Sequence, residues 1–205
     1  MAIADASTPA AGAKPLIIGI SGASGAILGL RALDLARAAG VRVHLVVSRA
    51  AWLTIGHELS LTRSEVERRA DVVHPVHDIG ACIASGSFPT QGMLIAPCSV
   101  RTMSEIATGV TSTLMGRAAD VVLKERRRLV LMVRETPLHL GHLRTMTALA
   151  EMGAVIAPPV PAFYARPADI DAMATHSAAR ALGLFGITAD GAPRWEGLRR
   201  SDPPR

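Results

Sequence analysis

Two clusters of small and hydroxyl-bearing residues follow apolar segments of the chain. The apolar run 16–21 leads into the glycine-rich segment 22–26, and the run 92–96 leads into a segment rich in hydroxyl groups, 97–104. Backbone N–H groups at the start of a helix attract anions, and glycine lets a phosphate approach the backbone closely. Both segments therefore predict contacts to a phosphate-bearing ligand. A tight turn in the first and helix capping by Ser99 in the second are the alternative interpretations.

The glycine spacing favours a mononucleotide over a dinucleotide. Gly19, Gly22 and Gly25 follow one another at intervals of three, whereas the dinucleotide fingerprint has its first two glycines two residues apart. No acidic residue follows the apolar segment 41–47, where such a fingerprint places the group that binds the ribose. We therefore expect FMN to bind and NAD not to bind.

A third cluster consists of charged residues. Arg117 and Lys124 are seven residues apart, so they share a face of a helix. Arg134 and Glu135 directly follow the apolar segment 129–133, where a buried charge pair is costly. Together these groups could hold a doubly charged phosphate and move its proton. A solvated helix face is the alternative interpretation of the first pair.

The apolar segments alternate with segments of helical periodicity. Continuous apolar runs typical of buried strands are separated by amphipathic stretches that end near glycines. This order predicts an α/β, Rossmann-like three-layer fold with a parallel sheet, whose ligand crevice lies at the carboxyl ends of the strands. The expected strands are 16–21, 41–47, 92–96, 129–133 and 154–157, and the expected helices are 24–39, 49–58, 100–124 with an interruption near Gly109, 138–152 and 167–185.

Length and composition predict one domain. The chain has 205 residues, of which 49% are hydrophobic and 19% charged, enough for a core without disulfides. We expect a leader at 1–14, a single domain at 15–187 and a tail at 188–205 whose Trp195 docks on the domain. Two widely spaced cysteines indicate a reducing cytoplasm. Residues 79–100 lack charged groups but contain too many polar residues and glycines for a membrane helix.

The net charge of +5 raises the question of an anionic partner. Only 3% of the residues are aromatic, so the stacking surfaces of nucleic-acid binders are scarce, and we predict no nucleic-acid partner. The pairs His74 and His77, and His139 and His142, have spacings that could bind a metal ion. Neither pair has a matching third ligand, so no metal is predicted.

Several segments, in this order along the chain, resemble the UbiX/Pad-type flavin prenyltransferases, formerly described as aromatic acid decarboxylases and connected with ubiquinone biosynthesis. The segments are 22–26, 96–99, 117–126, 134–140 and 158–164, and the resemblance extends from Leu16 to Trp195. It implies an enzyme that joins the dimethylallyl group of dimethylallyl phosphate to N5 and C6 of reduced FMN. It further implies that the prenylated FMN serves a UbiD-type decarboxylase, that no metal is required, and that twelve copies assemble with sites at subunit junctions.

The resemblance also implies a role for individual residues. The prenyl phosphate would meet cationic and hydrogen-bonding groups, Glu135 would relay protons, and Trp195 would cover the site. Residue 165 is alanine where the family often has histidine, a change to which we attach little weight. The implied catalytic residues are Ser24, Glu58, Lys124, Glu135 and Tyr164; the flavin contacts are Gly22, Ala23, Ser24, Ser48, Ser99, Val100, Arg101, Thr102 and Arg134; the prenyl phosphate contacts are Arg117, Lys124, Glu135, Tyr164, Arg180 and Trp195.

Two other functions remain open from the sequence. An FMN-dependent decarboxylase of cysteine-containing substrates would share the sheet and the flavin site, but it would not need the charged cluster around Lys124 and Glu135. A flavin carrier without chemistry of its own would need only the turns that bind FMN.

Overall fold

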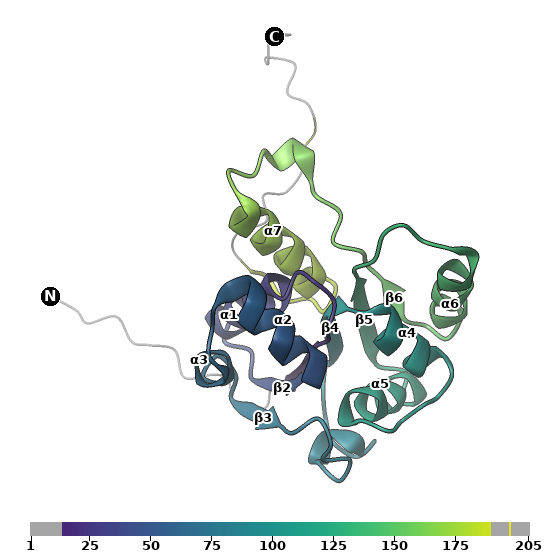
Figure 1. Ribbon diagram of the computed structural model, residues 1–205. Coiled ribbons are helices and arrows are strands. Elements are labelled where there is room, and N and C mark those ends of the chain that lie inside the picture. Colours follow the sequence, from purple (N-terminus) through teal and green to yellow (C-terminus); the bar gives the residue numbers. More distant parts are fainter. Residues whose placement is uncertain (1–13, 190–196, 198–205) are drawn as a thin grey trace, which may run out of the picture.

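The computed structural model describes residues 14–189 and residue 197. Strands and helices alternate along the chain, as the apolar runs and amphipathic segments predict (Figure 1). In chain order the elements are β1 (Leu16–Ile20), α1 (Ile27–Ala38), β2 (Val43–Val47), α2 (Arg49–Leu59), α3 (Arg63–Glu67), β3 (Val72–His74), the 3₁₀ turn η1 (Cys82–Ala84), β4 (Gly92–Cys98), α4 (Val100–Ala107), α5 (Leu114–Lys124), β5 (Arg128–Val133), α6 (Leu140–Glu151), β6 (Val155–Ile156), the 3₁₀ turn η2 (Phe163–Ala165) and α7 (Ile170–Gly183).

The six strands form one parallel sheet in the order β3-β2-β1-β4-β5-β6. The strand order reverses between β1 and β4, because the chain first builds outward to β3 and then returns to the other side of β1. Parallel sheets of this kind bind ligands at such a reversal, outside the carboxyl ends of the strands. The predicted α/β fold with a parallel sheet is confirmed.

Two hydrophobic clusters cover the two faces of the sheet. Side chains alternate along a parallel strand, so Leu16 and Ile18 face one cluster, to which α1 and α7 contribute, while Ile17 faces the other. Figure 1 shows α1 and α7 on one side of the sheet and α4, α5 and α6 on the other. Gly29 allows α1 to lie directly on β4, because a Cβ atom there would come within 2.4 Å of the Ala96 carbonyl oxygen.

A serine joins the two strands at the reversal. The Ser21 hydroxyl donates to the Pro97 carbonyl at 2.8 Å and accepts from the Ser99 amide at 2.7 Å. Ser21 is fully buried, and a buried hydroxyl group needs such partners. These two bonds fix the segments that follow β1 and β4 against each other.

Some boundaries and two elements differ from expectation. Helix α1 begins at Ile27 and not at Ser24, because the small residues before it form a turn with Gly25 at a φ of 95°. The sequence analysis missed α3 and β3, which have five and three residues and therefore too little periodicity to recognise. Within the described residues, no helix has the length and apolar character needed to span a membrane. The predicted leader and most of the predicted tail, including Trp195, lie outside the described residues.

Candidate functional site

Two helices begin at a cleft beside the strand reversal. Ser48 caps α2 by accepting from the Ala51 amide at 3.1 Å, and Ser99 caps α4 by accepting from the Thr102 amide at 3.2 Å. The capping interpretation of Ser99 is thus correct, and it is compatible with binding because the helix dipole still attracts an anion. The cleft has a volume of about 440 Å³, within the range of small-molecule sites. Its lining includes Gly22, Ser48, Arg49, Val76, Ser99, Arg101, Thr102, Glu105 and Met115.

Five of the predicted flavin contacts therefore share one cleft: Gly22, Ser48, Ser99, Arg101 and Thr102. Gly22 is required by close packing, because a Cβ atom there would lie 2.4 Å from the Cβ atom of Ala50 at the start of α2. Arg101 is largely exposed and pairs with Glu105 at 2.8 Å, so it is available at the rim of the cleft. Ala23 and Val100 lie in the same two turns, the first buried and the second half-buried.

A carboxylate lies at the start of α1. Glu58 accepts from the amides of Gly25, at 2.9 and 3.1 Å, and Ala26, at 3.0 Å. Glu58 thus provides the negative charge that a helix N-terminus favours, and the predicted phosphate contact at this turn stays a prediction. Desolvation raises the pKa of Glu58. The Ser24 hydroxyl, the two amides and the Arg134 charge outweigh it, so the pKa is lowered overall.

Arg134 links the end of β5 to the same turn. Its Nε donates to the Ser24 carbonyl oxygen at 2.8 Å, which brings together Ser24, Glu58 and Arg134. Glu135 is exposed, and its carboxylate accepts from the Thr136 amide at 3.0 Å. Among the described residues no ion pair joins Arg134 to Glu135, so the cost of a buried charge pair does not arise here. The reason is that the strand has ended and Glu135 already faces solvent.

Tyr164 and Arg180 line a second cavity, of about 360 Å³. It lies beside the edge strand β6 and α7, and its walls include Met132, Ala157 and His176. Tyr164 meets His176 edge to face, with ring centroids 6.1 Å apart. The structure thus brings two of the predicted prenyl phosphate contacts together. This cavity shares no lining residue with the cleft at Ser48 and Ser99.

Arg117 and Lys124 lie apart from both cavities. Arg117 donates to the Ala84 carbonyl oxygen at 3.3 Å and pairs with Asp120 at 2.9 Å. Lys124 ends α5 just before β5 begins and pairs with Glu125 at 2.7 Å. Glu135 follows β5, so a whole strand of six residues, about 3.3 Å each, separates the two sheet edges. Within one chain Lys124 and Glu135 therefore lie at opposite ends of β5, and their shared contact with a phosphate stays a prediction. The order of α5, β5 and Glu135 along the chain already indicates this separation.

Comparisons with known proteins identify the family. The model of the Flavoprotein family matches residues 5–179. The flavin prenyltransferase UbiX of Neisseria meningitidis serogroup B is 56% identical over 185 residues, which cover 90% of this chain and 98% of that protein. The chain belongs to the UbiX flavin prenyltransferase family.

Solved structures of UbiX proteins agree in fold. The crystal structure of AnUbiX (PadA1) in complex with FMN and dimethylallyl pyrophosphate has a TM-score of 0.89 at 43% identity, covering 91% of this chain and all of that one. The dodecameric FMN-dependent UbiX-like decarboxylase from Escherichia coli O157:H7 has a TM-score of 0.86 at 46% identity, covering 89% of this chain and all of that one. Both similarities span the three-layer fold.

Two features of the site were missed by sequence reasoning. The role of Ser21 in joining β1 to β4 has no local signal, because a serine at a strand end is common. The resemblance places Glu58 near the active site, but its contact with the glycine turn could not be predicted, since 32 and 33 residues separate the bonded groups.

Proposed function

We propose that this chain is a flavin prenyltransferase that joins the dimethylallyl group of dimethylallyl phosphate to N5 and C6 of reduced FMN. The observation that carries the proposal is the cleft at the strand reversal, where the capped starts of α2 and α4 meet the turn held by Glu58 and Arg134. A cysteine decarboxylase or a flavin carrier would give no reason for the charged groups outside this cleft.

The cleft fits FMN in size and chemistry. The N-termini of α2 and α4 attract the flavin phosphate, and Arg101 can donate to it from the rim. Gly22 lets the turn at the end of β1 pack closely against the start of α2, and so brings two walls of the cleft together. Bound reduced FMN supplies the two nucleophilic atoms. The chain orients the flavin with Ser48, Ser99, Val100, Thr102, Ala23 and Arg134.

The remaining residues act on the prenyl donor. When the allylic C–O bond breaks, negative charge develops on the phosphate, and Arg180 and Tyr164 stabilise it by charge and hydrogen bonding. Glu135 is exposed at the end of β5 and is free to relay a proton between the phosphate and the product. Ser24 and Glu58 set the geometry of the glycine-rich turn at 22–26.

Arg117 and Lys124 enter the site from a neighbouring copy of the chain. Within one chain Lys124 lies near the amino end of β5 and Glu135 follows its carboxyl end, which supports the proposal that a second copy presents the α5 residues. A homo-oligomer, which we propose to be a dodecamer, brings together the flavin cleft, the cavity at Tyr164 and Arg180, and the α5 residues Arg117 and Lys124. We further propose that the product passes to a UbiD-type decarboxylase. Both cysteines are free thiols, in keeping with a cytoplasmic location.

One anaerobic incubation tests the activity. The protein is mixed with reduced FMN and dimethylallyl phosphate, and the released flavin is analysed by mass spectrometry. We expect a flavin that carries one added dimethylallyl group, absent when either substrate is omitted. Dimethylallyl diphosphate in a parallel reaction tests the donor. Unmodified flavin with both donors, from protein that binds FMN, would leave only the carrier function.

A further inference from the structure

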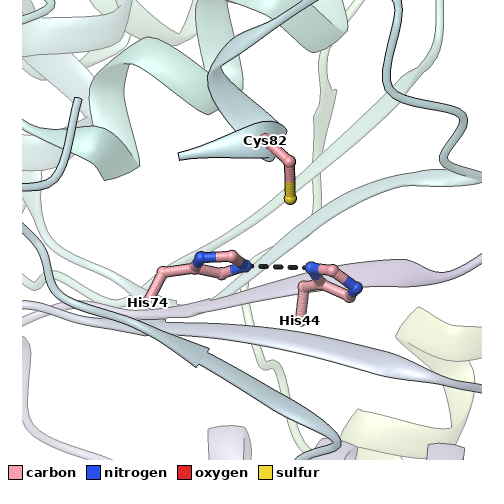
Figure 2. Close-up of side chains that lie close together, drawn as sticks. All are labelled: His44, His74 and Cys82. Carbon is pink, nitrogen blue, oxygen red and sulfur yellow. Dashed lines mark hydrogen bonds between the residues drawn. The ribbon is translucent and has the colours of Figure 1, made fainter. Parts of the chain in front are cut away.

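Three potential metal ligands gather on one face of the sheet, and none of them lines the proposed flavin cleft. The atoms His44 Nδ1, His74 Nε2 and Cys82 Sγ all lie within 4.8 Å of one another. Figure 2 shows the two imidazoles joined edge to edge and the Cys82 thiol pointing toward them. The two ring nitrogens are 2.9 Å apart.

The strand register places the two histidines on one face. β2 and β3 are parallel with His44 opposite Val72 and Val46 opposite His74. His44 and Val46 are two residues apart and so share a face of the sheet, which brings the His74 ring beside the His44 ring. The turn η1 then carries Cys82 over this face (Figure 2).

Both histidines are buried, and burial disfavours the charged form of an imidazole. His44 is 4% and His74 9% exposed. Desolvation, followed by the charge of His74, lowers the pKa of His44 to about 4, and desolvation also lowers the pKa of His74. Burial thus favours the neutral imidazole, and the proposal itself rests on the positions of the three ligand atoms.

We propose that His44, His74 and Cys82 form a binding site for a zinc-class metal ion. Two imidazole nitrogens and one thiolate are a donor set typical of Zn²⁺, with a water molecule as the fourth, tetrahedral ligand. Cys82 is exposed, so ions can enter from solvent and the water position stays open. Calcium and magnesium prefer oxygen ligands and are disfavoured here.

The coordination requires only small movements. Two nitrogens on a tetrahedral zinc ion at about 2.0–2.1 Å lie about 3.4 Å apart, so the rings must separate by about half an ångström. The ring that donates the present hydrogen bond moves its proton to its other nitrogen, which leaves two lone pairs facing the metal ion. Cys82 releases its thiol proton to solvent. The sulfur closes in from a turn that is exposed at this residue.

This site is separate from the prenyl transfer chemistry. None of its three residues lines the cleft at Ser48 and Ser99 or the cavity at Tyr164. The same 3₁₀ turn provides the Ala84 carbonyl that accepts from Arg117. The site is therefore placed to stabilise this turn without entering the reaction, while Arg117 is also held by Asp120.

Metal binding to the full-length, reduced protein tests the proposal. Co²⁺ is titrated first, because a thiolate ligand gives a charge-transfer band in the near ultraviolet. Zn²⁺ then competes with a chromophoric chelator to give the affinity. Cys82→Ser and His74→Gln remove ligands. His77→Gln is the matched control, because it removes an exposed imidazole of the same segment that does not belong to the cluster.

We expect one ion per chain and a charge-transfer band in the wild type and in His77→Gln. Cys82→Ser should abolish the band and weaken Zn²⁺ by more than about 100-fold, beyond the 10–100-fold that a merely supporting group costs. Cys82 is on the surface, so its substitution leaves folding intact and decides the outcome even if His74→Gln unfolds. Absence of stoichiometric binding in the wild type, or equal binding by Cys82→Ser, would overturn the proposal and leave a hydrogen-bonded histidine pair.

Discussion

Glu135 is the residue on which the proposed proton transfer depends most. It is exposed, and its contact is with the neighbouring Thr136 amide, so Glu135→Gln should change stability by only about 0–1 kcal/mol. The same change should slow formation of prenylated flavin by roughly 10²–10⁴, the usual contribution of general acid–base catalysis. FMN titration and product yield are measured on one variant. A normal rate would remove Glu135 from the mechanism.

Glu58 makes the stability of the glycine turn depend on pH. Its folded pKa is lowered relative to the ordinary value of 4.5, so its charge stabilises the fold above that pH and the contribution is lost as pH falls through the lowered value. Glu58 is exposed, so solvent screens this contribution, and Glu58→Gln should cost only about 0–1 kcal/mol at pH 7. The difference from wild type should shrink below pH 4. Denaturant unfolding at both pH values checks this, with Glu151→Gln as the control; an equal difference at both would contradict it.

The cationic side chains predict that the reaction needs no divalent metal. In the proposed site, Arg117, Lys124 and Arg180 would supply the positive charge that Mg²⁺ provides in enzymes that use diphosphates. EDTA should leave the initial rate within about twofold, because the proposed zinc site contains none of these groups. The rate is followed by mass spectrometry of the flavin. Loss of turnover in EDTA that Mg²⁺ restores would refute this prediction.

At the scale of elements, substitutions of two glycines test how closely the glycine turn packs against α2. Gly22→Ala places a Cβ atom 2.4 Å from that of Ala50 and should cost about 1–3 kcal/mol while weakening FMN. Gly56→Ala lies on α2 with no heavy atom within 4 Å of the new Cβ atom. It should stabilise the protein by up to about 1 kcal/mol and leave FMN binding unchanged. Unfolding curves and flavin titrations separate the two effects, and equal behaviour of the two variants would contradict the packing argument.

The central strands could be predicted because each is mostly apolar. β1, β2, β4 and β5 are buried over nearly their whole length, and His44 in β2 and Arg128 in β5 are too few to obscure the pattern. β3 has two half-buried residues and only three in all, so its sequence resembles a loop. The pairing of His44 with His74 depends on the position of β3, and for that reason the cluster could not be predicted from spacing.

At the scale of the whole molecule, the residues of the proposed site lie in separate regions of one chain. Ser48 and Ser99 could be placed together from the sequence, since both follow strands at the same edge of a parallel sheet. The separation of Lys124 from Glu135 was overlooked because the family resemblance gives a set of residues without saying which copy contributes each. The direction of β5 provides the missing information, because Lys124 comes shortly before the start of that strand and Glu135 follows its end.

Mixed oligomers can decide whether the site is shared between copies. Lys124→Gln and Glu135→Gln should each be inactive, because each removes a charged group from every site. If Lys124 of one copy serves Glu135 of another, an assembly of both variants in equal amounts regains intact sites. With random assembly, about one quarter of the sites receive both wild-type residues, so about one quarter of wild-type activity should return.

The two variants are therefore expressed together with different tags and purified through both, and the product is quantified per flavin site. A mixture of Lys124→Gln with Arg117→Gln is the matched control. Both of these residues lie on α5 of the same chain and reach the same site together, so no combination of the two variants rebuilds an intact set and activity should stay low. Equal recovery in both mixtures would point to residual activity of the variants. No recovery in either would mean that Lys124 and Glu135 do not meet across a subunit junction, and the proposed division of the site would be wrong.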